Sequence, residues 1–219
     1  MASTALVIGG TGRVGGHAVA KLTALGWRTR SMSRHPRPGD ATEAINGDIT
    51  DPVADHSALA GCDAVIVAVE SPYDSHGAHA VLNDGVRMVA GLAAPHGIHC
   101  VLVSQIHVTR PDAVPGFEAV AHARALGEEA LRTSGTPYTI VRPGRLTDDP
   151  GGRTGLRIEQ GDTGEGHVTC EDVAEACVRA LLAPDVSQGK TFEIYNDAYG
   201  PVPADWPTVF AALAPDPAA

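Results

Sequence analysis

The sequence predicts a doubly wound α/β fold built on a mostly parallel sheet. Short apolar runs alternate with longer segments of helical period, which is the pattern of strands joined by helical crossovers. The run DAVIVAV (63–69) is apolar along almost its whole length, as expected of a strand covered on both faces. A chain of 219 residues fits one domain with a substantial core. We therefore expect a single domain over residues 1–219.

The expected elements follow one another in a regular order. Strands are predicted at residues 4–9, 27–33, 63–69, 99–104, 138–143 and 190–196, with a further strand just before Asp48. Helices are predicted at residues 13–25, 79–94, 117–134 and 170–182, and a shorter one at 55–60. Gly26 ends the first helix, and Thr169 with Asp172 three residues later is a capping signal for the helix at 170–182. Strands separated by helices imply parallel pairing with right-handed crossovers.

Two segments near the C-terminus extend this core. Alternation in GLRIE (155–159) and EGHVT (165–169) predicts a small hairpin, and we expect residues 145–169 to form a lid on the substrate side. A helix is predicted within residues 203–214, where one face carries an apolar stripe made of Trp206, Val209, Phe210 and Leu213. This stripe docks either on the chain's own sheet or on a second subunit.

Composition excludes several classes of function. The formal net charge of −10 and the dispersed lysines and arginines argue against a nucleic-acid surface, which needs a basic stripe. No apolar segment is as long as a membrane span and no basic, apolar leader is visible, so we expect a cytoplasmic protein without membrane contact. No metal-binding spacing is found, and we expect no metal. Four cysteines without a CxxC pair are interpreted as reduced structural residues: Cys62, Cys100, Cys170 and Cys177.

A glycine-rich turn follows the first predicted strand. In TALVIGGTGRVGG, the glycines fit either Gly9-x-x-Gly12-x-x-Gly15 or Gly10-x-Gly12-x-x-Gly15. Glycines there let the backbone approach a pyrophosphate, while the following helix offers free N–H groups and the positive end of its dipole. The alternative is a tight strand-to-helix turn without a ligand. The position between the first strand and the first helix favours a dinucleotide site.

The end of the second strand indicates which dinucleotide binds. An NAD site usually has an acidic residue there, whereas this sequence has Ser33, Arg34 and Arg37. A guanidinium suits a 2′-phosphate, so NADP(H) is preferred over NAD(H), unless both arginines are only solvated loop charges. Asp48 follows the third strand, where it either accepts a bond from the adenine amino group or forms a turn.

Successive blocks of the chain resemble a known family. LVIGGTGRVGG, RSMSRHPRP, NGDITDP, LAGCDAVIVAV, VLVSQI, GEEALRTSGTPYTIVRPGRLTD and VTCEDVAEACVRALL are similar in content and order to the NmrA-like, NAD(P)-binding branch of the atypical short-chain dehydrogenase/reductases, over roughly residues 4–196. The resemblance implies a Rossmann fold. It places the following residues at the cofactor: Gly9, Thr11, Gly12, Arg13, Val14 and Gly15 at the pyrophosphate, Asp48 and Ile49 at adenine, Ala68, Val69 and Glu70 at the ribose, and Pro143, Gly144, Arg145 and Leu146 at the nicotinamide.

The chain departs from the wider family at its catalytic residues. Typical members combine a serine with a YxxxK pair, whose tyrosine donates a proton and whose lysine holds the ribose. Ser104 matches the serine, but Arg124 stands at the lysine position and Val120 at the tyrosine position. Arg124 can hold a ribose but is a poor acid or base. We therefore expect Ser104 and Arg124 to act together with His107 or His122 as the proton source.

These observations predict an NADP(H)-dependent reductase of a small carbonyl, quinone-like or conjugated substrate. A redox-neutral isomerase or cyclase and a non-catalytic NADP(H) sensor are the alternatives, because the tyrosine is missing. The expected partner is a small molecule, with a homodimer as a further option. Arg153, Arg157 and His167 either meet an anionic substrate or lie on a solvated face.

Overall fold

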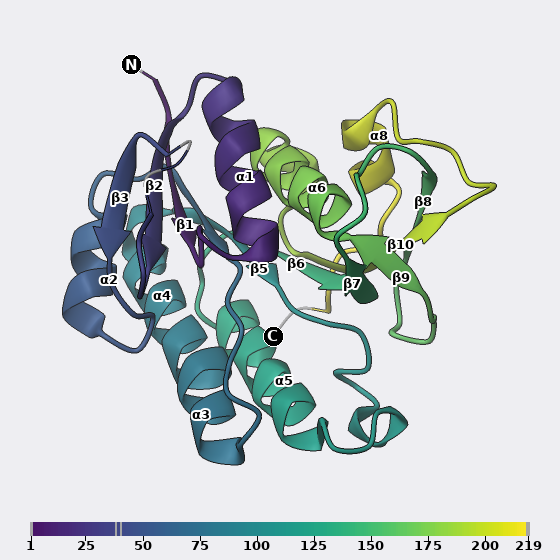
Figure 1. Ribbon diagram of the computed structural model, residues 1–219, viewed down its shortest axis with the longest axis horizontal. Coiled ribbons are helices and arrows are strands. Elements are labelled where there is room, and N and C mark those ends of the chain that lie inside the picture. Colours follow the sequence, from purple (N-terminus) through teal and green to yellow (C-terminus); the bar gives the residue numbers. More distant parts are fainter. Residues whose placement is uncertain (1, 38, 40, 218–219) are drawn as a thin grey trace.

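The computed structural model describes residues 2–37, 39 and 41–217. A central sheet of eight strands runs through it in the order β3-β2-β1-β4-β5-β6-β10-β8 (Figure 1). Every neighbouring pair is parallel except β10 with β8, which is antiparallel. The strands are β1 (Thr4–Ile8), β2 (Arg28–Ser33), β3 (Glu43–Asn46), β4 (Ala64–Val67), β5 (His99–Val103), β6 (Tyr138–Pro143), β8 (Gly155–Glu159) and β10 (Lys190–Asp197). The Rossmann-type, doubly wound fold predicted from the sequence is confirmed.

Helices cover both faces of this sheet (Figure 1). On one face α1 (Arg13–Ala24) and α6 (Cys170–Leu182) share a core with β1, β5 and β10. The other face buries apolar residues of α2 (Pro52–Leu59), α4 (Val86–Ala93) and α5 (Glu118–Arg132). None of the helices among the described residues has the length and apolar character needed to cross a bilayer. All four cysteines are buried and free, in agreement with the prediction.

The helix expected at 79–94 is built from three pieces. It begins with α3 (Ser75–His79), continues as a π-helical turn over Ala80–Gly85, and ends with α4. Asp74 caps its start by accepting from the N–H of Gly77 at 2.8 Å. At α6, the predicted cap is confirmed, because the side chain of Thr169 accepts from the N–H of Asp172 at 3.0 Å. A short α7 (Pro184–Ser187) follows α6.

The prediction that residues 155–159 and 165–169 pair with each other as a hairpin is wrong. Residues 155–159 form β8, which pairs with β10 at the edge of the main sheet. Residues 167–169 form β9 (His167–Thr169), which pairs in parallel with β7 (Arg145–Thr147) in a separate two-stranded sheet. Both segments are strands, but each finds a partner distant in sequence. That 145–169 acts as a lid stays a prediction.

The C-terminal helix α8 (Trp206–Ala211) docks on the chain's own core. Trp206 and Phe210 are buried, and the ring of Phe210 lies 5.8 Å from that of Phe192 in β10, centroid to centroid. Lys190 at the start of β10 donates to the carbonyl of Phe210 at 2.6 Å. Of the two docking options for the apolar stripe, these contacts favour the chain's own sheet.

Candidate active site

The glycine turn between β1 and α1 is shaped by close backbone approaches. Gly9 has φ +84°, and a Cβ there would collide with the carbonyl of Ala68. A Cβ on Gly15 would collide with the carbonyl of Gly9, so this glycine lets α1 pack against the turn. Gly12 caps α1 with an ordinary φ of −79° and is exposed. Its bare backbone leaves the first N–H groups of α1 open to an anion.

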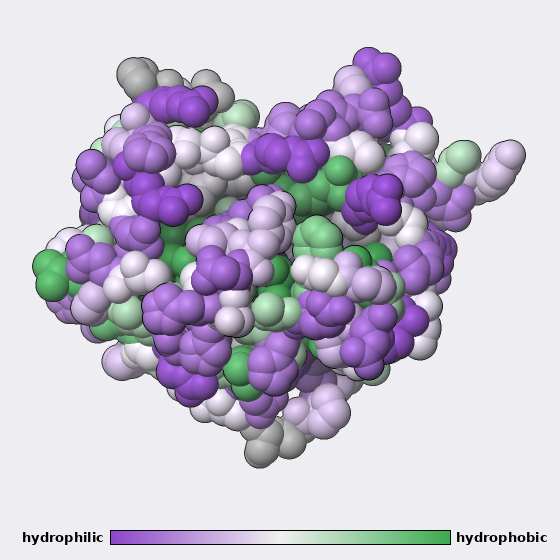
Figure 2. All heavy atoms as spheres, turned by 60° about the horizontal axis from the view of Figure 1, so that its bottom comes forward, coloured by the Kyte–Doolittle hydropathy of each residue, from purple (hydrophilic) through white to green (hydrophobic). Residues whose placement is uncertain are grey.

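A first cavity opens at this turn, where the strand order reverses between β1 and β4. It lies at the carboxyl ends of β1, β2 and β4, which is where doubly wound sheets bind ligands. Figure 2 views the molecule from this side, and apolar side chains are visible in recesses between hydrophilic ones. Predicted residues that line it are Gly9, Thr11, Gly12, Arg13, Val14, Ser33, Arg34, Arg37, Asp48, Ile49, Ala68, Val69, Glu70 and Leu146. The structure thus brings most of the predicted cofactor residues together.

The loop after β2 adds two positive charges to this cavity, beside those of Arg13 and Arg124. Arg34 and Arg37 are both exposed, and Nε of Arg34 lies 4.0 Å from Oδ2 of Asp48. The other oxygen of Asp48 accepts from the N–H of Thr50 at 3.0 Å and from its hydroxyl at 2.8 Å, so this aspartate does form a turn. His35 also lines the cavity and was not predicted. Because His35 directly follows Arg34 in the sequence, its place at this cavity could have been predicted.

Ser104 lies where the first cavity meets a second one. Its side chain is buried, and its Oγ has no hydrogen-bond partner in the part of the chain that the structure describes. Arg124 lines both cavities and donates to the carbonyls of Val103 at 3.0 Å and Val69 at 3.4 Å. Burial lowers the pKa of the Arg124 guanidinium from its usual value. Val120, at the tyrosine position, is buried and presents an apolar wall beside them.

The second cavity has a volume of about 940 Å³, within the range of roughly 300–1,000 Å³ that is usual for small-molecule sites. Pro143, Gly144 and Arg145 line only this cavity, whereas Leu146 lines both. Arg13, the first residue of α1, connects this helix to the segment after β7, because its Nε donates to Oδ1 of Asp148 at 2.7 Å. This bond raises the pKa of the Arg13 guanidinium and lowers that of the Asp148 carboxyl.

His107 is held in the second cavity by a strained backbone. Its φ is +65°, a region that residues other than glycine rarely adopt. The carboxylate of Asp162 fixes this turn by accepting from the N–H of His107 at 2.6 Å and from the N–H and hydroxyl of Thr109, both at 2.8 Å. The N–H of Asp162 in turn donates to Glu193 of β10 at 3.1 Å. Asp162 was not predicted, since its contacts span more than fifty residues.

The imidazole of His107 has a defined tautomer. Nη2 of Arg110 lies 3.2 Å from Nδ1, and a guanidinium can only donate, so Nδ1 accepts and the hydrogen of the neutral ring is on Nε2. Nε2 lies 3.3 Å from Oε2 of the exposed Glu165. His122 is different, because it is exposed on α5 and lines neither cavity. The structure therefore brings His107, and not His122, to the site.

Comparisons with known proteins agree with this geometry. Residues 9–184 match the model of a family described as NAD(P)H-binding. A (4-alkanoyl-5-oxo-2,5-dihydrofuran-3-yl)methyl phosphate reductase of Streptomyces griseus is 32% identical over 187 residues, covering 80% of this chain but only 62% of that protein. Sanguinarine reductase of Eschscholzia californica is 25% identical, with 96% of each chain covered. A Bacillus halodurans structure described as an NAD-dependent epimerase/dehydratase superposes with a TM-score of 0.83 at 24% identity, covering 96% of this chain and all of that one.

Proposed function

Because this chain belongs to the NAD(P)H-binding family, as its resemblance to the NmrA-like reductases predicted, we propose that it is an NADP(H)-dependent reductase. The proposed substrate is a small carbonyl, quinone-like or conjugated molecule. The observation that carries the proposal is the hydroxyl of Ser104, which is buried without a partner among the described residues where the two cavities meet. A polar group in that state is costly unless a ligand completes its hydrogen bonds. Two relatives whose names identify them as reductases support this reaction class.

The residues of the first cavity fit the cofactor. The glycine turn would hold the pyrophosphate, and Arg34 and Arg37 would bind the 2′-phosphate that distinguishes NADP(H). The exposed contact between Arg34 and Asp48 is weak and screened, so a phosphate can replace it. Arg124, fixed by two carbonyls at the junction, would hold the nicotinamide ribose.

The chemistry at the junction then follows from donors that this chain supplies. When held by the glycine turn, Arg34 and Arg124, NADPH would supply the hydride that reduces the carbon of the acceptor. The hydroxyl of Ser104 donates to the acceptor oxygen, where negative charge develops. A water molecule in the open cavity would supply the proton that completes the reduction, and His107, with Glu165 3.3 Å from its Nε2, would position that water. Val120 offers no proton, so these groups replace the tyrosine.

Because the usual proton-donating tyrosine is replaced by Val120, two other functions must be tested beside the reductase. A redox-neutral isomerase or cyclase would convert its substrate without net oxidation of NADPH, and the Bacillus halodurans neighbour is described as an epimerase/dehydratase. An NADP(H) sensor would bind the cofactor and convert nothing. Homodimer formation, a cytoplasmic location and a lid role for residues 145–169 stay predictions.

One experiment separates these functions. NADPH oxidation is followed at 340 nm with a panel of quinones, enones and aldehydes, and the products are identified by mass spectrometry. We expect steady oxidation that falls by about 10- to 1,000-fold in Ser104→Ala, the range for loss of an oxyanion-type donor. Affinity for NADPH should hardly change. Ser71→Ala is the matched control, because this serine also lines the second cavity but is not one of the buried side chains without a hydrogen-bond partner.

The other outcomes are equally informative. Conversion without net oxidation would assign the redox-neutral function, and tight binding without conversion would assign the sensor. Full activity in Ser104→Ala would show that the cleft is correct and its chemistry misassigned. The variant should fold normally, since the Oγ of Ser104 makes no hydrogen bond with the described residues that could be lost.

A further inference from the structure

Two aromatic rings stand at the rim of the second cavity. Tyr73 follows β4 and Phe117 precedes α5, and their rings meet edge to face with centroids 5.4 Å apart. Both side chains line the cavity and are exposed, by 69% and 42%. Large apolar surface left open at the mouth of a pocket is typical of a binding surface. A planar ring system could cover it.

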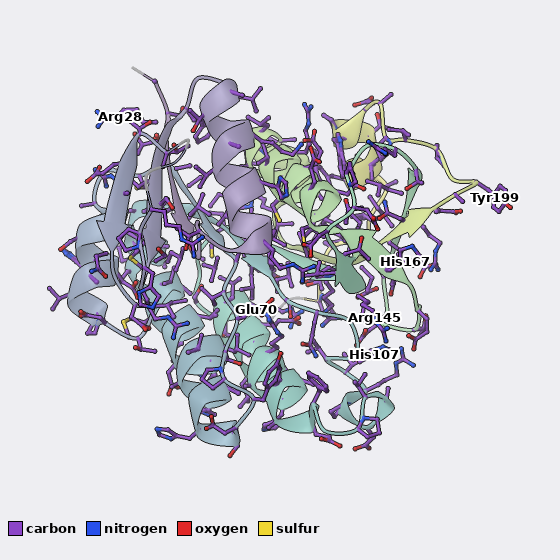
Figure 3. All side chains as sticks on the ribbon, in the orientation of Figure 1. Arg28, Glu70, His107, Arg145, His167 and Tyr199 are labelled. Carbon is purple, nitrogen blue, oxygen red and sulfur yellow. The ribbon has the colours of Figure 1, made fainter. Side chains whose placement is uncertain are left out.

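Two cationic or ionisable side chains lie on another wall of the same cavity. Arg145 of β7 and His167 of β9 are register partners in the two-stranded sheet, so their side chains lie next to each other. Both are exposed and line the cavity. Figure 3 shows them close to His107, to the right of Glu70.

Arg145 differs from the other arginines that line this cavity. Arg13 is paired with Asp148, and Arg124 is bound to two carbonyl groups. Arg145 makes no ion pair with any residue that the structure describes. Its donors are therefore available to a ligand.

Two carboxylates also line the cavity and must be considered. Glu165 lies 3.3 Å from Nε2 of His107, so its charge is directed at that ring. Glu70 interacts electrostatically with Arg13 and Arg124. Neither carboxylate pairs with Arg145 or His167 in the described chain. The wall formed by β7 and β9 thus keeps an uncompensated positive charge.

We propose that the second cavity selects a planar conjugated molecule that carries an anionic group. The ring system lies against Tyr73 and Phe117, and a carboxylate, sulfonate or phosphate is bound by Arg145 with His167 beside it. The inference deepens the proposed function, because the end of the molecule to be reduced would then lie toward Ser104. A guanidinium binds such oxyanions through charge-assisted, often bidentate hydrogen bonds.

The test uses probes that cannot be reduced, so that it does not depend on turnover. Binding of 2-naphthoate and of its neutral isostere 2-naphthamide is measured by calorimetry on the full chain saturated with NADP⁺. We expect naphthoate to bind about tenfold tighter or more, as is usual for hydrogen bonds to a charged group. Arg145→Met should bring the ratio of the two affinities close to one. Phe117→Ala should weaken both probes by the same factor.

Each variant contains its own control for folding and cofactor occupancy, because the ratio compares two probes on one protein. Arg153→Met is the matched control, since Arg153 is exposed in the same segment but lines neither cavity. Equal binding of the two probes, a preference that survives Arg145→Met, or no binding of either probe would overturn the proposal. A naphthoate preference without NADPH oxidation by any quinone or enone would keep the anionic subsite and refute the reductase. NADPH oxidation without a preference for naphthoate would support the reductase and refute the anionic subsite.

Discussion

Replacing Arg34 by alanine tests whether this protein selects NADP(H). Arg34 directly follows β2 and lines the first cavity, at the position where NAD-specific sites have an acidic residue. Its side chain is 64% exposed, and its ion-pair contact is with Asp48 at 4.0 Å. An exposed pair of this length contributes about 0–1 kcal/mol to folding, so Arg34→Ala should leave the fold intact.

The expected loss concerns NADPH alone. A hydrogen bond to a charged group contributes about 1.5–3 kcal/mol, which corresponds to a dissociation constant roughly 10- to 150-fold higher for NADPH. NADH has no 2′-phosphate, so its affinity should change little. Arg34→Lys keeps the positive charge but loses the planar guanidinium, so its affinity for NADPH should lie between that of the wild type and that of Arg34→Ala.

Dissociation constants for both cofactors can be measured by fluorescence titration at low and high salt. The wild-type preference for NADPH should shrink as salt screens the exposed guanidinium. Arg28→Ala is the matched control, because Arg28 begins the same strand at the opposite end and is also exposed (Figure 3). Equal losses for NADPH and NADH, or an unchanged NADPH affinity, would refute the assignment.

Three further substitutions test the turn, the substrate half and a buried carboxyl. Gly12→Val should fold, because φ is −79°, yet lose both cofactors by blocking the pyrophosphate; unchanged affinity would contradict the site. Asp162→Asn should lower kcat by about tenfold or more through the loosened His107 turn, with little change in NADPH affinity; a parallel loss of both would indicate a merely structural role. Burial, with Asp51 and Asp48 nearby, raises the pKa of Asp55 from 3.8 to about 8. The folded state therefore keeps a proton that the unfolded chain releases above pH 4, and stability should fall as pH rises from about 4 to 8. Asp55→Asn should stabilise the protein at pH 8–9 by about 2 kcal/mol, below an upper limit of about 6, and the gain should vanish near pH 4; a pH-independent gain in urea unfolding would contradict it.

The lining of the first cavity could be predicted because its determinants are local in sequence. The glycine turn lies within a few residues between one strand and one helix, and Arg34 follows the next strand directly. The sequence could also have decided between His107 and His122 as the histidine at the site. Val120 and Arg124 are four residues apart on α5 and face the cavity together, so His122, two residues from each, must point elsewhere.

The pairing of β8 and β9 could not be predicted in this way. Alternating apolar residues identify a strand but not its partner, and a short turn between two such segments favours a hairpin. Here each segment pairs with a strand distant in sequence: β8 extends the main sheet beside β10, and β9 joins β7. Only the three-dimensional packing decides between these pairings.

That pairing predicts that the two cavities can vary independently of each other. Asp162 follows β8, which lies against β10 in the main sheet. The N–H of Asp162 donates to Glu193 of β10, and the carboxylate of Asp162 accepts from the N–H of His107. Glu193 is itself held by Arg142 of β6, whose Nη1 donates at 3.1 Å in a buried ion pair. The geometry of His107 therefore depends on the edge of the sheet far from the glycine turn. Substitutions along β8 and β10 should change which substrate is accepted and how fast it reacts while cofactor affinity stays the same, because no residue of that edge lines the first cavity.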